Sequence, residues 1–258
     1  MINIKYNMNK KSKKAFNKIF TILIIVVSMT LMFSIADLFS SLIAVGGFNF
    51  ANDDVFMAKY DVYAICTSTN QTLIQAQENA NICISLGGAG YILLDDQYYV
   101  VASIYENEAD AKKVQESLTA TKPSAIIKKV EIPSVSLQST LSTQEKSTLT
   151  ETFLLFKNSY KKLYDISVSL DTGVIQEINA RLSVNELASS ITEVGNNFNT
   201  VFSNNSGANL LKIKNAVNNL STAINDLVNS SKVPYTSYIK HAYCESLFIY
   251  KALCESIT

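Results

Sequence analysis

The fold is decided by two stretches of sequence, Tyr63-Ala-Ile-Cys-Thr-Ser68 and Tyr99-Val-Val-Ala-Ser-Ile-Tyr105. Both are rich in β-branched and aromatic residues, which favour strands. Each leads into a helix-like run, residues 71–86 after the first stretch and residues 107–119 after the second. The chain therefore contains a strand-helix pattern twice in succession.

A short β-branched segment follows each of these helices, at residues 91–94 and 125–131. Three glycines end the first helix, and Asp95-Asp96-Gln97 predicts a tight turn between the two halves. We therefore predict a βαββαβ unit over residues 61–132. Its four-stranded sheet carries both helices on one face.

Working outward toward the N-terminus, residues 19–48 are apolar over a length that can cross a bilayer, which needs about 20 residues. Six lysines and no acid precede this segment. The positive-inside rule then places residues 1–18 in the cytoplasm, as a basic tail, and the rest of the chain outside it. A cleaved signal peptide is the alternative, because Ser34-Ile-Ala36 is typical of a cleavage site. Residues 51–60 are interpreted as a tether.

The charge balance beyond the membrane segment limits the possible partners. From residue 51 onward the chain holds 16 basic and 21 acidic residues. This acidic balance argues against nucleic acid as a partner. The four cysteines, Cys66, Cys83, Cys244 and Cys254, are expected to be buried and free, with a Cys66–Cys83 disulfide as the alternative.

Toward the C-terminus, Pro133 opens a Ser/Thr-rich linker at residues 133–143. Residues 144–258 then show helical periodicity with three breaks, and Ser142 with Glu145 forms a capping-box pattern. We predict about four helices in an up-down bundle. The predicted fold class is thus α+β, with an N-terminal transmembrane helix, the βαββαβ domain and an all-α C-terminal bundle.

The two strand signatures and the βαββαβ order resemble the SPOR domain, a peptidoglycan-binding module of bacterial cell-division and sporulation proteins. The resemblance covers residues 61–132 and is strongest in the second half, from Tyr99 to Leu118. The glycine and the polar strand residue typical of that family are missing from both halves. A single-pass anchor followed by such a domain is also similar to the stage II sporulation protein B type.

The resemblance implies that the helix-free face of the sheet binds glycan strands stripped of their stem peptides. By strand alternation, Val62, Ala64 and Cys66 should lie under the helices. The opposite, open face is then expected to present the glycan-binding residues: Tyr63, Ile65, Thr67, Tyr99, Val101, Ser103 and Lys129. The alternative is that the C-terminal bundle covers this face and buries the tyrosines.

The sequence offers little that points to catalysis. His241 is the single histidine and lies in an apolar helix pattern, and the cysteines lack metal-site spacing. No spacing predicts the paired carboxylates that glycan hydrolysis needs. We therefore expect a non-enzymatic protein without a cofactor, anchored in the cell membrane, that binds septal peptidoglycan during division or sporulation. The alternative is an interaction protein whose bundle recruits a membrane or cell-wall partner.

Overall fold

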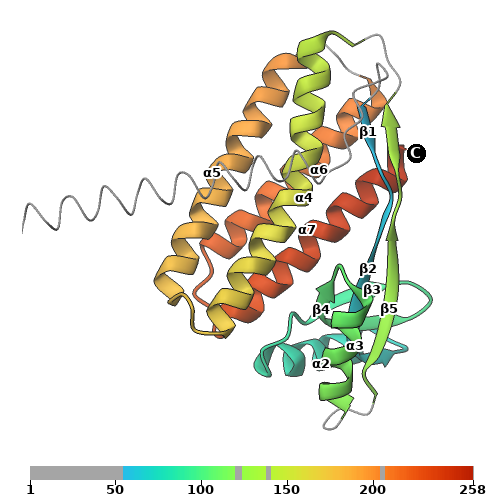
Figure 1. Cartoon of the computed structure of the whole chain (residues 1–258), viewed down its shortest axis with the longest axis vertical. Coiled ribbons are helices and arrows are strands. Elements are labelled where there is room, and N and C mark those ends of the chain that lie inside the picture. The colour runs from blue at the N-terminus through green and yellow to red at the C-terminus, as the bar shows by residue number, and fades with distance from the viewer. Residues whose placement is uncertain (1–54, 120–123, 138–140, 204–206, 258) are drawn as a thin grey trace, which may run out of the picture. The chain divides into compact units, whose positions relative to one another are not determined.

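The computed structural model describes residues 55–119, 124–137, 141–203 and 207–257. These belong to one compact unit that begins at residue 52 (Figure 1). Its strands are β1 (Val55–Met57), β2 (Tyr60–Asn70), β3 (Tyr91–Leu94), β4 (Tyr98–Tyr105), β5 (Ile126–Ile132) and β6 (Val135–Leu137). Its helices are α2 (Leu73–Ser85), α3 (Glu108–Thr119), α4 (Thr143–Asp171), α5 (Glu177–Val201), α6 (Ala208–Val228) and α7 (Tyr235–Ile257).

The predicted βαββαβ unit is present as β2-α2-β3-β4-α3-β5. Its four strands form one antiparallel sheet in the order β3-β4-β2-β5, so the first and third strands of the unit lie in the middle. The two helices connect strands that do not pair with each other. The sheet order therefore follows from the local sequence pattern together with short connections.

A second sheet was not predicted. It pairs β1 with β6 in antiparallel register, Val55 opposite Leu137. The pairing is stabilised by burial, because Val55, Met57 and Val135 lie inside while Phe56 points outward. Parts of the predicted tether and linker are thus strands, and β1 packs near α4.

The predicted fold class is wrong in its combination of elements, although the described part of the chain is α+β. It combined a transmembrane helix with a single sheet, whereas the described part of the chain has six helices and two sheets. None of the helices within the described ranges is long and apolar enough to cross a bilayer. The predicted membrane segment, residues 19–48, lies outside the described residues.

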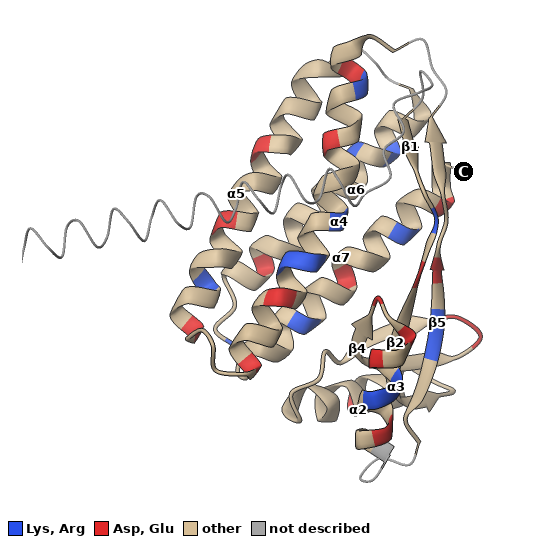
Figure 2. Cartoon of the chain, viewed as in Figure 1, with Lys and Arg blue, Asp and Glu red and all other residues tan. Residues whose placement is uncertain are grey.

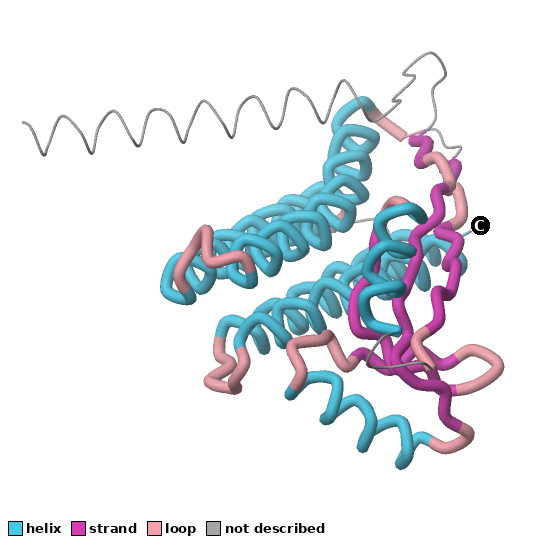
Figure 3. Tube along the Cα trace, turned by 60° about the horizontal axis from the view of Figure 1, so that its bottom comes forward, coloured by secondary structure: helices cyan, strands magenta, loops and turns pink. Residues whose placement is uncertain are grey.

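Helices α4 to α7 form the predicted four-helix bundle, in which each helix packs against two others (Figure 3). The capping box at the start of α4 is formed, because Ser142 and Glu145 bond reciprocally. The heptad-spaced side chains of α6 face inward, and they are Ile213, Val217, Leu220, Ile224 and Leu227. The four cysteines are buried thiols that form no disulfide bond, as predicted.

The sheet lies between two sets of helices. In β3, Ile92 packs against the core of α2, whereas the ring of its neighbour Tyr91 stacks on Phe248 of α7 at a centroid distance of 5.0 Å. Consecutive strand residues point to opposite faces. Helices α2 and α7 therefore cover opposite faces of this part of the sheet, and the bundle occupies the face that was expected to be open.

Candidate functional site

The predicted glycan-binding residues do not form an open face. Ile65 and Val101 are fully buried, and Tyr99 is only 8% exposed. The Tyr99 hydroxyl donates to Asp96 at 2.8 Å, and the Lys128 ammonium group lies 4.1 Å from the centre of its ring. The expectation of an exposed aromatic platform is corrected accordingly, because its central side chains are part of the core.

The predicted residues also do not share one face of the sheet. Val62 of β2 lines a cleft with Tyr243 and Leu247 of α7, so the next residue, Tyr63, points the other way, toward Lys112 of α3. Val101 pairs with Tyr91 and so lies on the α7 side. The small residues at the start of β2 therefore lie under the bundle, not under α2 and α3.

The predicted glycan-binding residues lie on different faces of the sheet because the pairing of β2 with β4 is irregular. The register shifts between Ile65 and Cys66 and again between Cys66 and Ser68. In β4, Ala102 packs toward α2, whereas Ile104 lines the cleft beside α7. A bulge adds an unpaired residue and so changes which side chains face which layer. Strict alternation, on which the sequence prediction depended, fails here.

The remaining three predicted residues have polar roles at the edge of this core. Thr67 donates a hydrogen bond to the Val100 carbonyl oxygen, and Ser103 is half-buried. Lys129 is exposed and forms an ion pair with Asp61 at 2.9 Å. Glycan binding by the seven residues stays a prediction that these contacts do not test.

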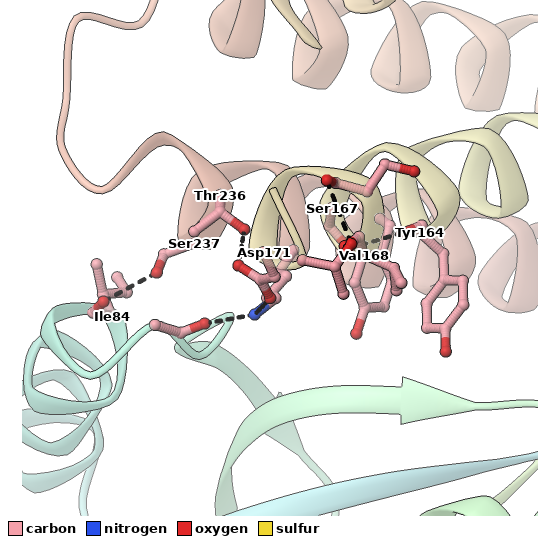
Figure 4. Close-up of polar contacts among 12 residues, drawn as sticks. Ile84, Tyr164, Ser167, Val168, Asp171, Thr236 and Ser237 are labelled. Carbon is pink, nitrogen blue, oxygen red and sulfur yellow. Dashed lines mark hydrogen bonds and ion pairs between the residues drawn. The ribbon is translucent and has the colours of Figure 1, made fainter. Parts of the chain in front are cut away.

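The start of α7 is joined to the last turn of α2 and to the glycine-rich loop that follows it (Figure 4). Ser237 donates to the Ile84 carbonyl oxygen at 2.9 Å, and Lys240 donates to that of Gly87 at 2.8 Å. The His241 ring contacts the carbonyl oxygen of Ala89 at 3.1 Å. The single histidine thus has a structural contact, and these bonds hold the sheet unit to the bundle.

A concavity lies where the end of β4 and the start of α3 meet α4 and α7. We call it the junction cleft, and its volume is about 240 Å³. The lining includes three buried aliphatic residues and two buried tyrosines. The full lining is Val62, Ile104, Tyr105, Glu106, Asn107, Asp110, Tyr160, Lys161, Tyr164, Asp165, Tyr243 and Leu247.

Tyrosine rings form one part of the junction cleft. Tyr164 of α4 meets Tyr105 edge-on at a centroid distance of 6.2 Å and meets Tyr243 in the same way at 5.8 Å. Such edge-to-face contacts fix the ring orientations. Tyr160, one turn before Tyr164, is buried and donates its hydroxyl hydrogen to the Glu106 carboxylate at 2.5 Å. The rings therefore form a rigid wall.

Carboxylates form the rim of the cleft. Glu106 follows β4, Asp110 lies in the first turn of α3, and Asp165 lies on α4. Partial burial raises the pKa of Asp165 above its ordinary value; nearby Lys161 lowers it and Glu106 raises it. The rim holds three acidic groups and one ammonium group, so its net charge is negative at neutral pH.

The sequence prediction missed this site because its parts lie some fifty residues apart in the chain. Glu106 and Asp110 belong to the sheet unit, whereas Tyr160, Tyr164 and Asp165 belong to the bundle. One signal was present: Tyr160 and Tyr164 are four residues apart and so share one face of a helix. Their partner across the cleft could not be read from sequence.

The chemistry available here is binding through rings, carboxylates and one amide. Within the described ranges, no group of three or more His, Cys, Asp or Glu residues is placed to hold a metal ion. The three rim carboxylates therefore surround the cleft without converging on one point. Basic and acidic residues are interspersed over the helices and strands (Figure 2), so no described element carries a continuous basic track.

Comparisons with known proteins give no assignment: no protein-family model matches the sequence, and neither a curated protein nor a solved structure matches the chain.

Proposed function

We propose that this protein is a non-catalytic glycan-binding protein of the bacterial cell envelope, and that it holds a sugar unit in the junction cleft. The observation that carries the proposal is the combination of Tyr105, Tyr164, Asn107 and the rim carboxylates around one cleft. Aromatic rings contact the C–H faces of sugars, while carboxylates and amides bond their hydroxyl groups. Peptidoglycan strands stay the proposed ligand.

The site differs from the one that the resemblance to the SPOR domain implies. The sheet face is covered by the bundle, so a glycan strand would have to bind at the junction between α3 and α4. Since the cleft holds about 240 Å³, we expect it to take one ring of a strand, with neighbouring rings outside. Specificity would then depend on the substituents of that ring.

The test is co-sedimentation of the full-length chain, in detergent, with purified peptidoglycan before and after amidase removal of the stem peptides. We expect wild-type protein to sediment with the stripped glycan and Tyr164→Ala to lose most of this binding. Tyr238→Ala, on α7 outside the cleft, is the control. Absence of wild-type binding to either form would refute the proposal, as would equal retention of both variants.

Recruitment of a membrane or cell-wall protein by the bundle is the second candidate. It is favoured by Ile178 and Leu182 of α5, which are 65% and 57% exposed and share one helix face. A photoreactive amino acid placed at residue 178 in living cells should then yield a discrete adduct. The same probe at residue 189, a polar position on α5, is the control. No adduct, or the same adduct at both positions, would argue against this candidate.

The proposed location is the cell membrane, with the N-terminus in the cytoplasm and the described part outside. It follows from the lysine distribution around residues 19–48, and it stays a prediction. Protease added to intact spheroplasts should degrade the described part. Complete protection would contradict the predicted location.

A further inference from the structure

We propose that the sugar unit bound in the junction cleft carries a free ammonium group, as a glucosamine unit does and an N-acetylglucosamine unit does not. This inference rests on the proposed glycan binding and specifies its ligand. It is carried by the arrangement of acids and rings, in which three carboxylates from three segments border a wall of tyrosines.

The charge of the cleft is not cancelled within the protein. Asp110 has an ion pair with Lys113 at 3.3 Å, but both side chains are more than half exposed, and such pairs stabilise little. Lys161 is the one ammonium group in the lining. Glu106 accepts its hydrogen bond from the neutral Tyr160 hydroxyl. A positively charged ligand would therefore reduce the net negative charge of the cleft, whereas a neutral ligand would leave that charge unchanged.

The tyrosine wall favours the same kind of ligand. The face of an aromatic ring is negative, so a cation within about 6 Å of its centre is attracted. Tyr105 and Tyr164 are both partly exposed and held edge-to-face. An ammonium group between these rings and the rim carboxylates would meet negative potential on several sides.

Asp165 supplies a further indication. It is the rim carboxylate whose charged form is disfavoured by burial, so its pKa is raised in the absence of a ligand. The groups that face it are Lys161 on its own helix and Glu106 from the sheet unit. An ammonium group bound beside it would return this pKa toward its ordinary value, so ligand binding would release protons from Asp165, whereas a fully ionised site would have none to release. Binding should therefore weaken as pH falls through the Asp165 pKa.

The experiment compares two soluble oligosaccharides, the tetramer of glucosamine and the tetramer of N-acetylglucosamine, by calorimetric titration into the full-length protein at pH 6.5. We expect the glucosamine tetramer to bind about tenfold more tightly, the effect of one additional ion pair. Asp165→Asn and Glu106→Gln should each weaken its binding several-fold. Glu193→Gln, which removes one exposed negative charge from α5 outside the cleft lining, is the matched control.

The outcomes separate the two proposals. Binding of the acetylated tetramer as tightly as the glucosamine tetramer would overturn the ammonium inference and leave glycan binding intact. An equal loss of affinity for the glucosamine tetramer in Glu193→Gln and Asp165→Asn would also overturn it. The attraction would then come from the overall negative charge of the protein and not from the cleft. No binding of either tetramer would refute the glycan proposal itself. Binding of a lysine tripeptide but of neither tetramer would assign the cleft to an amine-bearing peptide.

Discussion

The backbone N–H of Ile104 in β4 donates a hydrogen bond to the hydroxyl oxygen of Tyr243 in α7, at an N···O distance of 2.9 Å. The two residues are 139 positions apart, and the tyrosine is 2% exposed. A strand N–H is thus satisfied by a side chain from the bundle. Both residues line the junction cleft, and their hydrogen bond joins the sheet unit to the bundle there.

Tyr243→Phe should therefore destabilise the protein. The substitution leaves the Ile104 N–H buried without a partner, which costs about 1–3 kcal/mol. Urea unfolding followed by circular dichroism measures the change. Tyr238→Phe is the matched control, because that half-buried ring contacts Lys232 through its face. Equal stability of the two variants would show that water replaces the tyrosine oxygen.

Tyr99→Ala should act as a core substitution. Removing this largely buried ring takes away the hydrogen bond to Asp96 and the contact with Lys128, and we expect a loss of about 3 kcal/mol in the free energy of unfolding. Tyr63→Ala, at a partly exposed position, should lose less. Tyr99→Phe should keep both the fold and any glycan binding. Loss of glycan binding by a stable Tyr99→Phe would instead support the sheet as the binding site.

The raised pKa of Asp165 predicts a pH dependence of stability. An acid whose pKa is higher in the folded than in the unfolded state favours folding when it is protonated. Its contribution is therefore present below its unfolded pKa and lost as pH rises through its folded pKa. Relative to Asp165→Asn, wild-type protein should become less stable as pH rises from below the ordinary aspartate pKa through the higher pKa of folded Asp165. Thermal melts of both proteins across this range test the sign, and a difference that grows in the opposite direction would contradict it.

We also predict that the rim carboxylates bind the glycan without hydrolysing its glycosidic bonds. Glycoside hydrolysis needs two carboxyl groups at a defined separation across the scissile bond. The rim acids come from three segments and surround the cleft. Incubation of the protein with peptidoglycan should therefore release no reducing ends above the level of a Glu106→Gln variant. Release that disappears in that variant would identify an enzyme.

Ser142→Ala should weaken the start of α4. It removes both the side-chain acceptor for the Glu145 N–H and the reciprocal arrangement of the capping box. The expected loss is about 1 kcal/mol. Ser231→Ala, at an exposed loop position, is the control. Because the cap holds the first turn of α4 in place, hydrogen exchange should also increase there in the Ser142→Ala variant. No change in exchange would mean that packing alone holds this helix end.

By itself the sequence determined the order and type of most elements of the described part. Two β-branched strand signatures followed by helices predicted β2-α2-β3-β4-α3-β5, and apolar periodicity with breaks predicted α4 to α7. These signals are local, since they depend on side-chain spacing within one element. The two short strands β1 and β6 were missed because a strand of three residues carries almost no periodic signal.

Only the tertiary structure decided which face of the sheet is covered and where a binding site lies. The register shifts around Cys66 changed the faces of β2 and β4, and the bundle then closed over the side expected to be open. The junction cleft joins Glu106 and Asp110 to Tyr164 and Asp165, which approach each other because α4 and α7 dock on the sheet. Docking depends on the shape and burial of whole surfaces, so it cannot be predicted from the spacing of residues within one segment.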